Sequence, residues 1–188
     1  MKRCTTRRAL RVFCAAFAAL LLLLSVPLPA HAELAEMDEI IASAYCVYNL
    51  SQNMLLYSKE YDTKIAPGAT VKIMTGILAF EHFQGHTDDM ITIKEEALRG
   101  VSGNILKPGL KAGEQISADS LLRALIINNC NDAAHVLAYE VAGSITEFVN
   151  QMNKKARELG CENTFFVNPT GLDDQNMYTT VHDLVLIS

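Results

Sequence analysis

The segment that most constrains this chain is APGATVKIMTGILAFE, residues 66–81. It predicts a helix with apolar side chains on nearly every side, namely Val71, Ile73, Met74, Ile77, Leu78 and Phe80. A helix of this kind is usually buried in the middle of a domain. One lysine, Lys72, interrupts the apolar surface, so the sequence predicts a central buried helix with a cationic side chain near its beginning.

The segments around this helix predict a mixed α/β chain. Residues 43–58, SAYCVYNLSQNMLLYS, hold two apolar runs separated by three polar residues, which predicts a β-hairpin. Residues 88–93 predict a short strand, and the glycine-rich residues 100–117 predict loops and turns. The second half predicts helices over 117–127, 131–143 and 144–160 and from Thr180 onwards, with the structured loop CENTFFVNPTGLDD before the last one.

The four later helices carry recognisable capping signals. The helix predicted over 131–143 is expected to end at Gly143, and the helix predicted over 144–160 at Gly160. Glycine readily adopts the left-handed conformation that commonly ends a helix. The expected N-terminal caps are Ser117; Asn131 or Asp132; Ser144, three residues before Glu147; and Thr180, three residues before Asp183.

Residues 1–32 differ in composition from the rest. A basic start is followed by the apolar run VFCAAFAALLLLL and by the small-x-small pattern Ala30-His31-Ala32. This layout predicts a secretory signal peptide cleaved after Ala32, which leaves an incomplete domain over 33–188. The alternative is an uncleaved membrane anchor, but this run falls short of the roughly 20 apolar residues that a spanning helix needs. We therefore expect export through the cytoplasmic membrane to the cell envelope or beyond.

The charge balance bears on binding partners. Residues 1–32 hold five of the 16 Lys and Arg and none of the 21 Asp and Glu, so residues 33–188 carry a net charge of −10. This charge argues against a nucleic-acid partner. Cys46, Cys130 and Cys161 show no metal-like spacing, nor do the histidines, and a disulfide between two of these cysteines is left open. We expect neither a metal nor another cofactor.

Seven stretches, in this order, connect the chain to a known family: KIMTGILAFE, LKPG, GEQIS, LLRALIINNCNDAA, MNKKARELG, NTFFVNPTGLDD and YTTVHDL. With them, residues from about 43 to 188 resemble the N-terminal part of the serine-type D-Ala-D-Ala carboxypeptidases of peptidase family S11. These are low-molecular-weight penicillin-binding proteins. The resemblance implies a β-lactamase/transpeptidase-like fold, trimming of peptidoglycan stem peptides through an acyl-enzyme, and acylation by β-lactams.

The family uses three motifs, Ser-x-x-Lys, Ser-x-Asn and Lys-Thr-Gly. A serine hydroxyl is a weak nucleophile that needs a nearby base. A lysine three residues later lies on the same helix face and can serve as that base if burial lowers its pKa. The resemblance places Lys72 at the general-base position and Asn131 at the third residue of Ser-x-Asn.

Both serines of these motifs are absent. Ala69 stands at the nucleophile position and Asn129 at the position of the proton-relaying serine. Without a hydroxyl at residue 69, acyl-enzyme formation has no attacking atom, and loss of such a nucleophile costs on the order of 10⁶ in rate. Thr70 lies about 200° round the helix from Lys72, on the wrong face to replace it. Thr75 lies deeper in the helix.

Cys130, the middle residue of the second motif, has two interpretations. Its thiol is either a replacement nucleophile near Lys72 or a small residue at a variable position, and we favour the second. Ser102-Gly103-Asn104 also reads Ser-x-Asn, but it lies in the glycine-rich loop before LKPG and is set aside.

No Lys-Thr-Gly follows the second motif before Ser188. We therefore expect a domain truncated before the sheet strands that carry this motif, with the hairpin at 43–58 lacking its neighbours. Three interpretations stay open. The chain is an inactive carboxypeptidase homologue, a non-catalytic envelope protein that binds peptidoglycan or a partner, or one half of a split enzyme whose sheet a separate chain completes.

Overall fold

The computed structural model describes residues 40–101 and 109–188. It divides into the units Met1–Ile41 and Ala42–Ser188, and the helices and strands of the described residues belong to the second unit. The predicted signal peptide and the tripeptide Ser102-Gly103-Asn104 lie outside the described residues. Within those described ranges, no helix is both long and apolar enough to cross a membrane.

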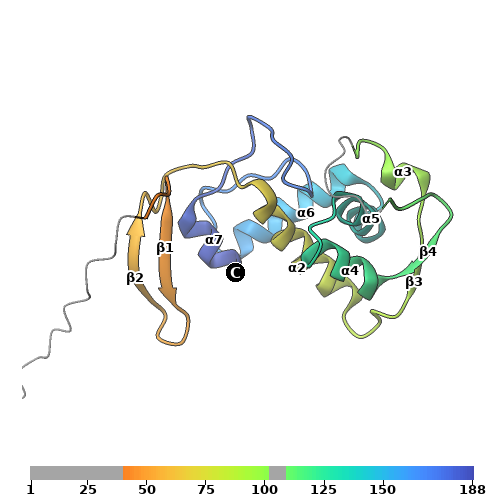
Figure 1. Cartoon of the computed structure of the whole chain (residues 1–188), viewed down its shortest axis with the longest axis horizontal. Helices are drawn as coiled ribbons and strands as arrows, with labels where there is room; N and C mark the ends of the chain where they lie inside the picture. Colours follow the sequence, from red (N-terminus) through yellow and green to blue (C-terminus); the bar gives the residue numbers. More distant parts are fainter. Residues whose placement is uncertain (1–39, 102–108) are drawn as a thin grey trace, which may run out of the picture. The chain divides into compact units, whose positions relative to one another are not determined.

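The chain forms a mixed arrangement of helices and two small sheets, as the sequence predicts (Figure 1). The elements in chain order are β1 (Tyr45–Asn49), β2 (Met54–Lys59), the 3-10 turn η1 (Gly68–Thr70), α2 (Val71–Phe83), β3 (Met90–Thr92), α3 (Glu95–Leu98), β4 (Gln115–Ser117), α4 (Ala118–Ile126), α5 (Asn131–Ala142), α6 (Ile145–Glu158) and α7 (Val181–Ile187).

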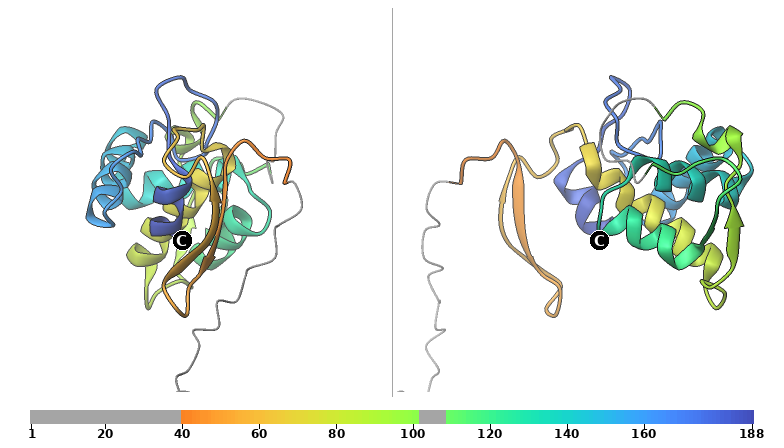
Figure 2. Two further views of the ribbon diagram at one scale, coloured as in Figure 1. Left: turned by 90° about the vertical axis from the view of Figure 1, so that its left-hand side faces the viewer. Right: turned by 45° about the vertical axis from the view of Figure 1, so that its right-hand side comes forward.

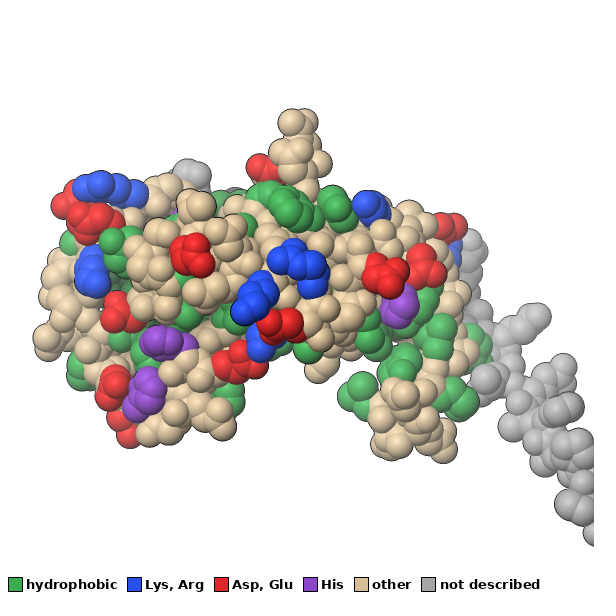
Figure 3. Space-filling view, turned by 180° about the vertical axis from the view of Figure 1, so that it is seen from behind, with side chains coloured by type: hydrophobic (Ala, Val, Ile, Leu, Met, Phe, Trp, Pro, Cys, Tyr) green, Lys and Arg blue, Asp and Glu red, His purple; other side chains and the backbone are tan. Residues whose placement is uncertain are grey.

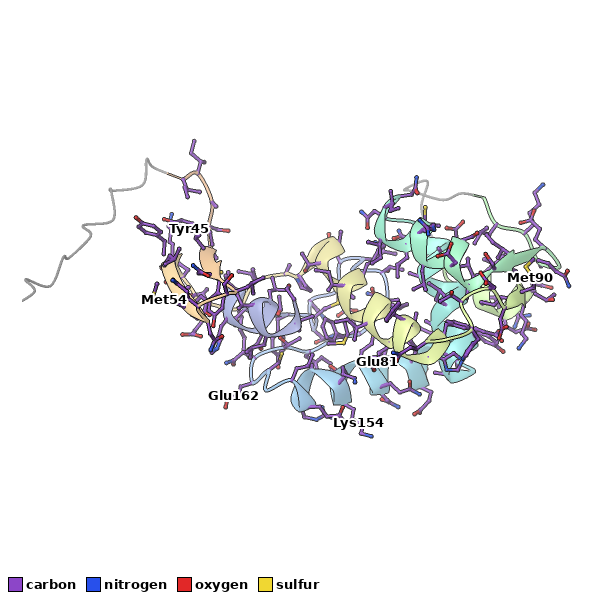
Figure 4. The ribbon with its side chains drawn as sticks, turned by 90° about the horizontal axis from the view of Figure 1, so that it is seen from below. Tyr45, Met54, Glu81, Met90, Lys154 and Glu162 are labelled. Carbon is purple, nitrogen blue, oxygen red and sulfur yellow. The ribbon has the colours of Figure 1, made fainter. Side chains whose placement is uncertain are left out.

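Both sheets are two-stranded and antiparallel. The predicted hairpin is confirmed as β1 and β2, with a bulge between Val47 and Tyr48. Tyr45 and Met54 mark this hairpin at one end of the unit, and Met90 marks the β3–β4 ribbon at the other (Figure 4). Strand β4 lies in a segment predicted to be loop, and that prediction is wrong. Its three residues, Gln115-Ile116-Ser117, are too few to give a strand pattern of their own, and they are extended because they pair with β3.

Helix α2 connects the two hydrophobic cores of the unit. Its second half, with Ala79 and Phe83, packs with residues of α4 and α5. Its first half, with Val71 and Met74, packs with residues of α6 and α7. Figure 2 shows α2 running between these groups of helices. The predicted central helix is thus confirmed, and displacement of α2 would disturb both cores.

One face of α2 is not buried, which corrects the expectation of burial all round. Ile73 is 37% exposed and Phe80 is 57% exposed. Together with Ile126 of α4 they line an open groove of 570 Å³. Helix α4 shields only one side of this face, and no element within the described residues covers the remainder. The hairpin likewise exposes Val47, Leu50, Met54 and Leu55, and apolar side chains gather on it in the space-filling view (Figure 3).

Three predicted helix caps are confirmed. The side chains of Ser117, Ser144 and Thr180 accept hydrogen bonds from the backbone N–H groups three residues later. Gly143 ends α5 with φ +73°, as expected. Each hydroxyl satisfies a backbone donor that the helix itself leaves without a partner.

The predicted cap of α5 is wrong. Its N-cap is Cys130, and Asn131 and Asp132 lie in the first turn. One carboxylate oxygen of Asp132 accepts from the Ala133 N–H, while the other accepts from the N–H groups of Gly109 and Leu110 at 3.2 and 3.3 Å. This side chain fastens a neighbouring loop to the helix, a tertiary contact that the capping pattern does not reveal.

An ion pair ties α2 to α6. Lys155 Nζ lies 2.8 Å from a carboxylate oxygen of Glu81, the α2 residue labelled in Figure 4. Both groups are partly exposed, so the pair contributes at most about 1 kcal/mol. On the face shown in Figure 3, basic and acidic side chains are interspersed.

His135 is a buried titratable residue in α5. Its side chain is 6% exposed, and its Nδ1 has no hydrogen-bond partner among the described residues. Burial lowers the pKa of His135 below its usual range, and the backbone of Ala97 and the charge of Asp132 oppose this shift only in part. The folded state therefore binds a proton at His135 less readily than the unfolded chain does.

We expect the free energy of unfolding to decrease as the pH falls below about 6.5, the ordinary histidine pKa, because the unfolded state then binds more protons. One such group contributes a slope of at most about 1.4 kcal/mol per pH unit. In His135→Gln this part of the slope should disappear. Denaturant unfolding of both proteins between pH 5 and 8 tests this, with pH 8, where the histidine is neutral in both states, as the reference. An unchanged slope in the variant would contradict it.

Candidate functional site

The turn η1 and the first turn of α2, which follows it directly, hold two of the residues singled out in the sequence. Ala69 lies in η1 and is exposed, and Lys72 lies in the first turn of α2 and is 5% exposed. The Thr70 hydroxyl donates to Pro67 O at 2.6 Å, so its proton is already engaged by the backbone of the same turn. Ala69 therefore presents an exposed methyl group three residues before the buried amine of Lys72. The Ser-x-x-Lys motif has a serine hydroxyl at this position.

Lys72 is held by a loop from the far end of the chain. Its Nζ donates to Thr170 O at 2.7 Å, and one turn further on the Thr75 hydroxyl donates to Pro169 O at 2.8 Å. Burial lowers the pKa of Lys72, and the neighbouring Cys130 opposes this shift. An amine in such a site can lose and regain a proton near neutral pH more easily than an exposed lysine.

The turn between α4 and α5 brings the second motif toward this amine. Asn129 adopts a left-handed conformation with φ +55°, which asparagine tolerates better than most residues. Asn131 is 4% exposed. Lys72 and Cys130 lie close enough that each affects the proton affinity of the other. The structure therefore brings Lys72 together with the second motif.

The environment of Cys130 opposes a role as nucleophile. The thiol is buried, and its Sγ lies 3.6 Å from Asn128 O as a weak donor. Burial raises the pKa of Cys130, the charge of Asp132 raises it further, and Lys72 lowers it only in part. Because the thiolate is the reactive form, a raised pKa reduces reactivity. Cys46, Cys130 and Cys161 are all free thiols, and burial raises the pKa of Cys161 to about 11.

The loop that holds Lys72 is pressed against the turn that carries Ala69. Gly171 has φ +79°, and a Cβ built on it would overlap Gly68 O. Beside this contact, a cavity of 270 Å³ is lined by two segments, residues 66–68 and the side of the loop that contains Asp173 and Met177. From the sequence, NPTG was expected only as part of a structured loop, and the contacts of Thr170 with α2 and of Gly171 with η1 were not predicted. The spacing of Pro169 and Gly171 was the available signal for a tight turn.

Gly171→Ala should destabilise the protein by about 2 kcal/mol or more, since an alanine is strained at this φ and its methyl group would displace Gly68. Gly143→Ala is the matched control, because Gly143 has φ +73° but open space around its Cβ position. It should show only the backbone strain, about 1 kcal/mol. Urea unfolding measures both, and equal losses would contradict the close approach of residues 68 and 171.

Comparisons with known proteins agree with this arrangement. A family model described as D-alanyl-D-alanine carboxypeptidase, peptidase S11, matches residues 31–188. The D-alanyl-D-alanine carboxypeptidase DacF of Bacillus subtilis is 36% identical over 138 residues, which are 71% of this chain and 34% of the relative. The DacA enzyme of Haemophilus influenzae is 32% identical over 152 residues, which are 79% of this chain and 39% of the relative.

Solved structures give the same result. The carboxypeptidase DacD of Francisella tularensis matches with a TM-score of 0.73 and 34% identity, over 80% of this chain and 36% of that one. Penicillin-binding protein 5 of Haemophilus influenzae matches with a TM-score of 0.72 and 31% identity, over 80% and 45%. The expected β-lactamase/transpeptidase-like fold is confirmed for the part present. The chain spans between a third and a half of these four relatives.

Proposed function

The chain belongs to the D-alanyl-D-alanine carboxypeptidase family, peptidase S11, and from this membership we propose that it is a non-hydrolysing member that binds the peptide ends of peptidoglycan. One observation carries the proposal. Ala69 is exposed in the turn just before α2 and carries no hydroxyl group, whereas the buried Lys72 is retained with a lowered pKa. The base is present, but the atom that it would deprotonate is not.

The neighbouring groups offer no substitute nucleophile. The Thr70 hydroxyl is bonded to Pro67 O, the Thr75 hydroxyl is buried and bonded to Pro169 O, and the Cys130 thiol is buried with a raised pKa. Asn129 has an amide where a relay would need a hydroxyl. These features support binding without acyl transfer. Export by a signal peptide over 1–32 and a place in the cell envelope belong to the same proposal, as does the absence of a nucleic-acid partner.

The test uses the full chain and a chimaera. In the chimaera, the region that follows the matched segment in the Bacillus subtilis relative is fused after Ser188. Each protein is incubated with a penicillin, and its intact mass is measured before peptide mapping. We expect no adduct on either, and a stoichiometric adduct on the chimaera with Ala69→Ser and Asn129→Ser. The matched control adds Lys72→Met to that double variant and should abolish the adduct.

An adduct on the unsubstituted chain at Thr70, Thr75 or Cys130 would overturn the proposal and identify the nucleophile. The proposed binding of peptide ends is tested separately, by NMR titration of the chimaera that retains Ala69 with a D-Ala-D-Ala peptide. Shifted resonances without peptide cleavage are expected. A chimaera that forms the adduct after serine restoration, but fails to bind the peptide when Ala69 is present, would refute the binding role.

A second candidate, one half of a split enzyme, is favoured by the exposed apolar surface. The groove over α2 and α4 has 570 Å³ and is lined mainly by Ile73, Phe80 and Ile126 with their neighbours. A second groove, of 460 Å³, lies between β1 and α7. Apolar patches of this kind often mark protein interaction surfaces. A separate chain that supplies sheet strands would cover them.

For this candidate, we expect the region used in the chimaera to bind the full chain when supplied as a separate polypeptide. Phe80→Asp should weaken the binding by about ten-fold or more, because it places a charge in the apolar interface. Leu159→Asp is the control, since Leu159 is 37% exposed but lines neither groove. Calorimetric titration measures both affinities, and the candidate is ruled out if the two polypeptides do not associate.

A further inference from the structure

The side chain of Asn168 organises the loop that reaches Lys72. Its Oδ1 accepts hydrogen bonds from Thr170 N at 3.1 Å, from Thr170 Oγ1 at 2.9 Å and from Gly171 N at 2.8 Å. Its Nδ2 donates to Leu172 O at 2.9 Å. One amide therefore closes the turn from both ends, in the manner of an Asx-turn.

This turn points two successive carbonyl groups at α2. Pro169 O accepts from the hydroxyl of Thr75, and Thr170 O accepts from Nζ of Lys72. The centre of the turn and both donors are buried, with Lys72 5%, Thr75 0% and Thr170 2% exposed, whereas Asn168 itself is half-buried. A buried donor that loses its acceptor is strongly disfavoured, so these bonds hold the lysine and the loop in one arrangement.

We propose that Asn168 is a positioning residue, which fixes the place of the Lys72 amine by holding the Thr170 carbonyl toward α2. This positioning of the Lys72 amine requires no hydroxyl group on residue 69 or residue 129. In the part of the chain that the structure describes, the loop supplies the hydrogen-bond acceptor of Lys72, so serines restored at residues 69 and 129 would meet an amine that is already in place. This role of Asn168 does not depend on whether the protein binds peptidoglycan.

The chain offers a matched comparison in Asn153 of α6. Its Nδ2 donates to Phe166 O at 2.8 Å, and its Oδ1 accepts from Phe166 N at 2.8 Å. It also fastens the start of the same loop through side-chain-to-backbone bonds, and at 8% exposed it is more buried than the half-buried Asn168. Because these bonds hold residue 166 and not the turn at 168–172, loss of the Asn153 side chain reports general loosening of the loop.

The experiment is NMR of the full chain with ¹³C- and ¹⁵N-labelled lysine, with the Lys72 signal assigned by Lys72→Met. The readout is the exchange of the Nζ protons with water, which is slow for a buried and hydrogen-bonded ammonium. In Asn168→Ala we expect this exchange to become roughly ten-fold faster or more, as expected when a buried hydrogen bond opens. The pKa of Lys72 should rise toward the ordinary lysine value in the same variant, because water reaches the amine.

Asn168→Asp is the conservative variant, since a carboxylate oxygen can accept the same three bonds although it cannot donate to Leu172 O, and it should keep the exchange slower than Asn168→Ala does. Asn153→Ala should lower the thermal stability but leave the Lys72 signal unchanged. The proposal is overturned if Asn168→Ala leaves the exchange slow, if Asn168→Asp speeds it as much as alanine does, or if Asn153→Ala speeds it equally. Should Asn168→Ala fail to fold, Thr170→Val, which removes one of the three bonds, decides by the same readout.

Discussion

The hydrogen bond from Lys72 to Thr170 O is the contact on which the site depends. It joins residues 98 positions apart, because the amine near the start of α2 needs a buried acceptor and the loop after α6 supplies it. Burial of an amine is tolerable only with such a partner. The bond also fixes the loop that presses on η1, and hence the surroundings of Ala69. Since α2 contributes to both hydrophobic cores, the same helix connects the site to the stability of the unit.

The sequence predicted the parts of this arrangement that depend on local signals. The hairpin, the central helix and the caps Ser117, Ser144 and Thr180 follow from side chains within a few residues of each other. The failures lie where a distant partner decides the local structure. Strand β4 forms because it pairs with β3. The Asp132 side chain was predicted as a possible cap of α5, but it accepts a hydrogen bond from the backbone of a neighbouring loop. The open face of α2 depends on what packs against it, and side-chain periodicity does not contain that information.

The candidate site divides in the same way. The resemblance to the family predicted Ala69, Lys72, Asn129 and Asn131 as positions of the site, because the family's motifs have fixed spacings along the chain. It did not reveal Asn168, whose side chain acts only on the backbone of its own turn and reaches Lys72 through a carbonyl group. Every residue type has a backbone carbonyl group, so the contact made by Thr170 O cannot be recognised from a sequence motif. Such contacts become apparent only when the two segments are placed in space.

Burial explains why this site keeps some family residues and lacks others. Ala69 is exposed and Asn129 only half-buried, so a hydroxyl can be absent from either position without leaving a buried polar group unpaired. Lys72, by contrast, is 5% exposed and donates to a buried carbonyl. Replacing it with an apolar residue would leave that carbonyl unpaired, at a cost of about 1–3 kcal/mol. Retention of Lys72 is thus accounted for by packing and hydrogen bonding, and it is not by itself a sign that the chemistry of the family persists.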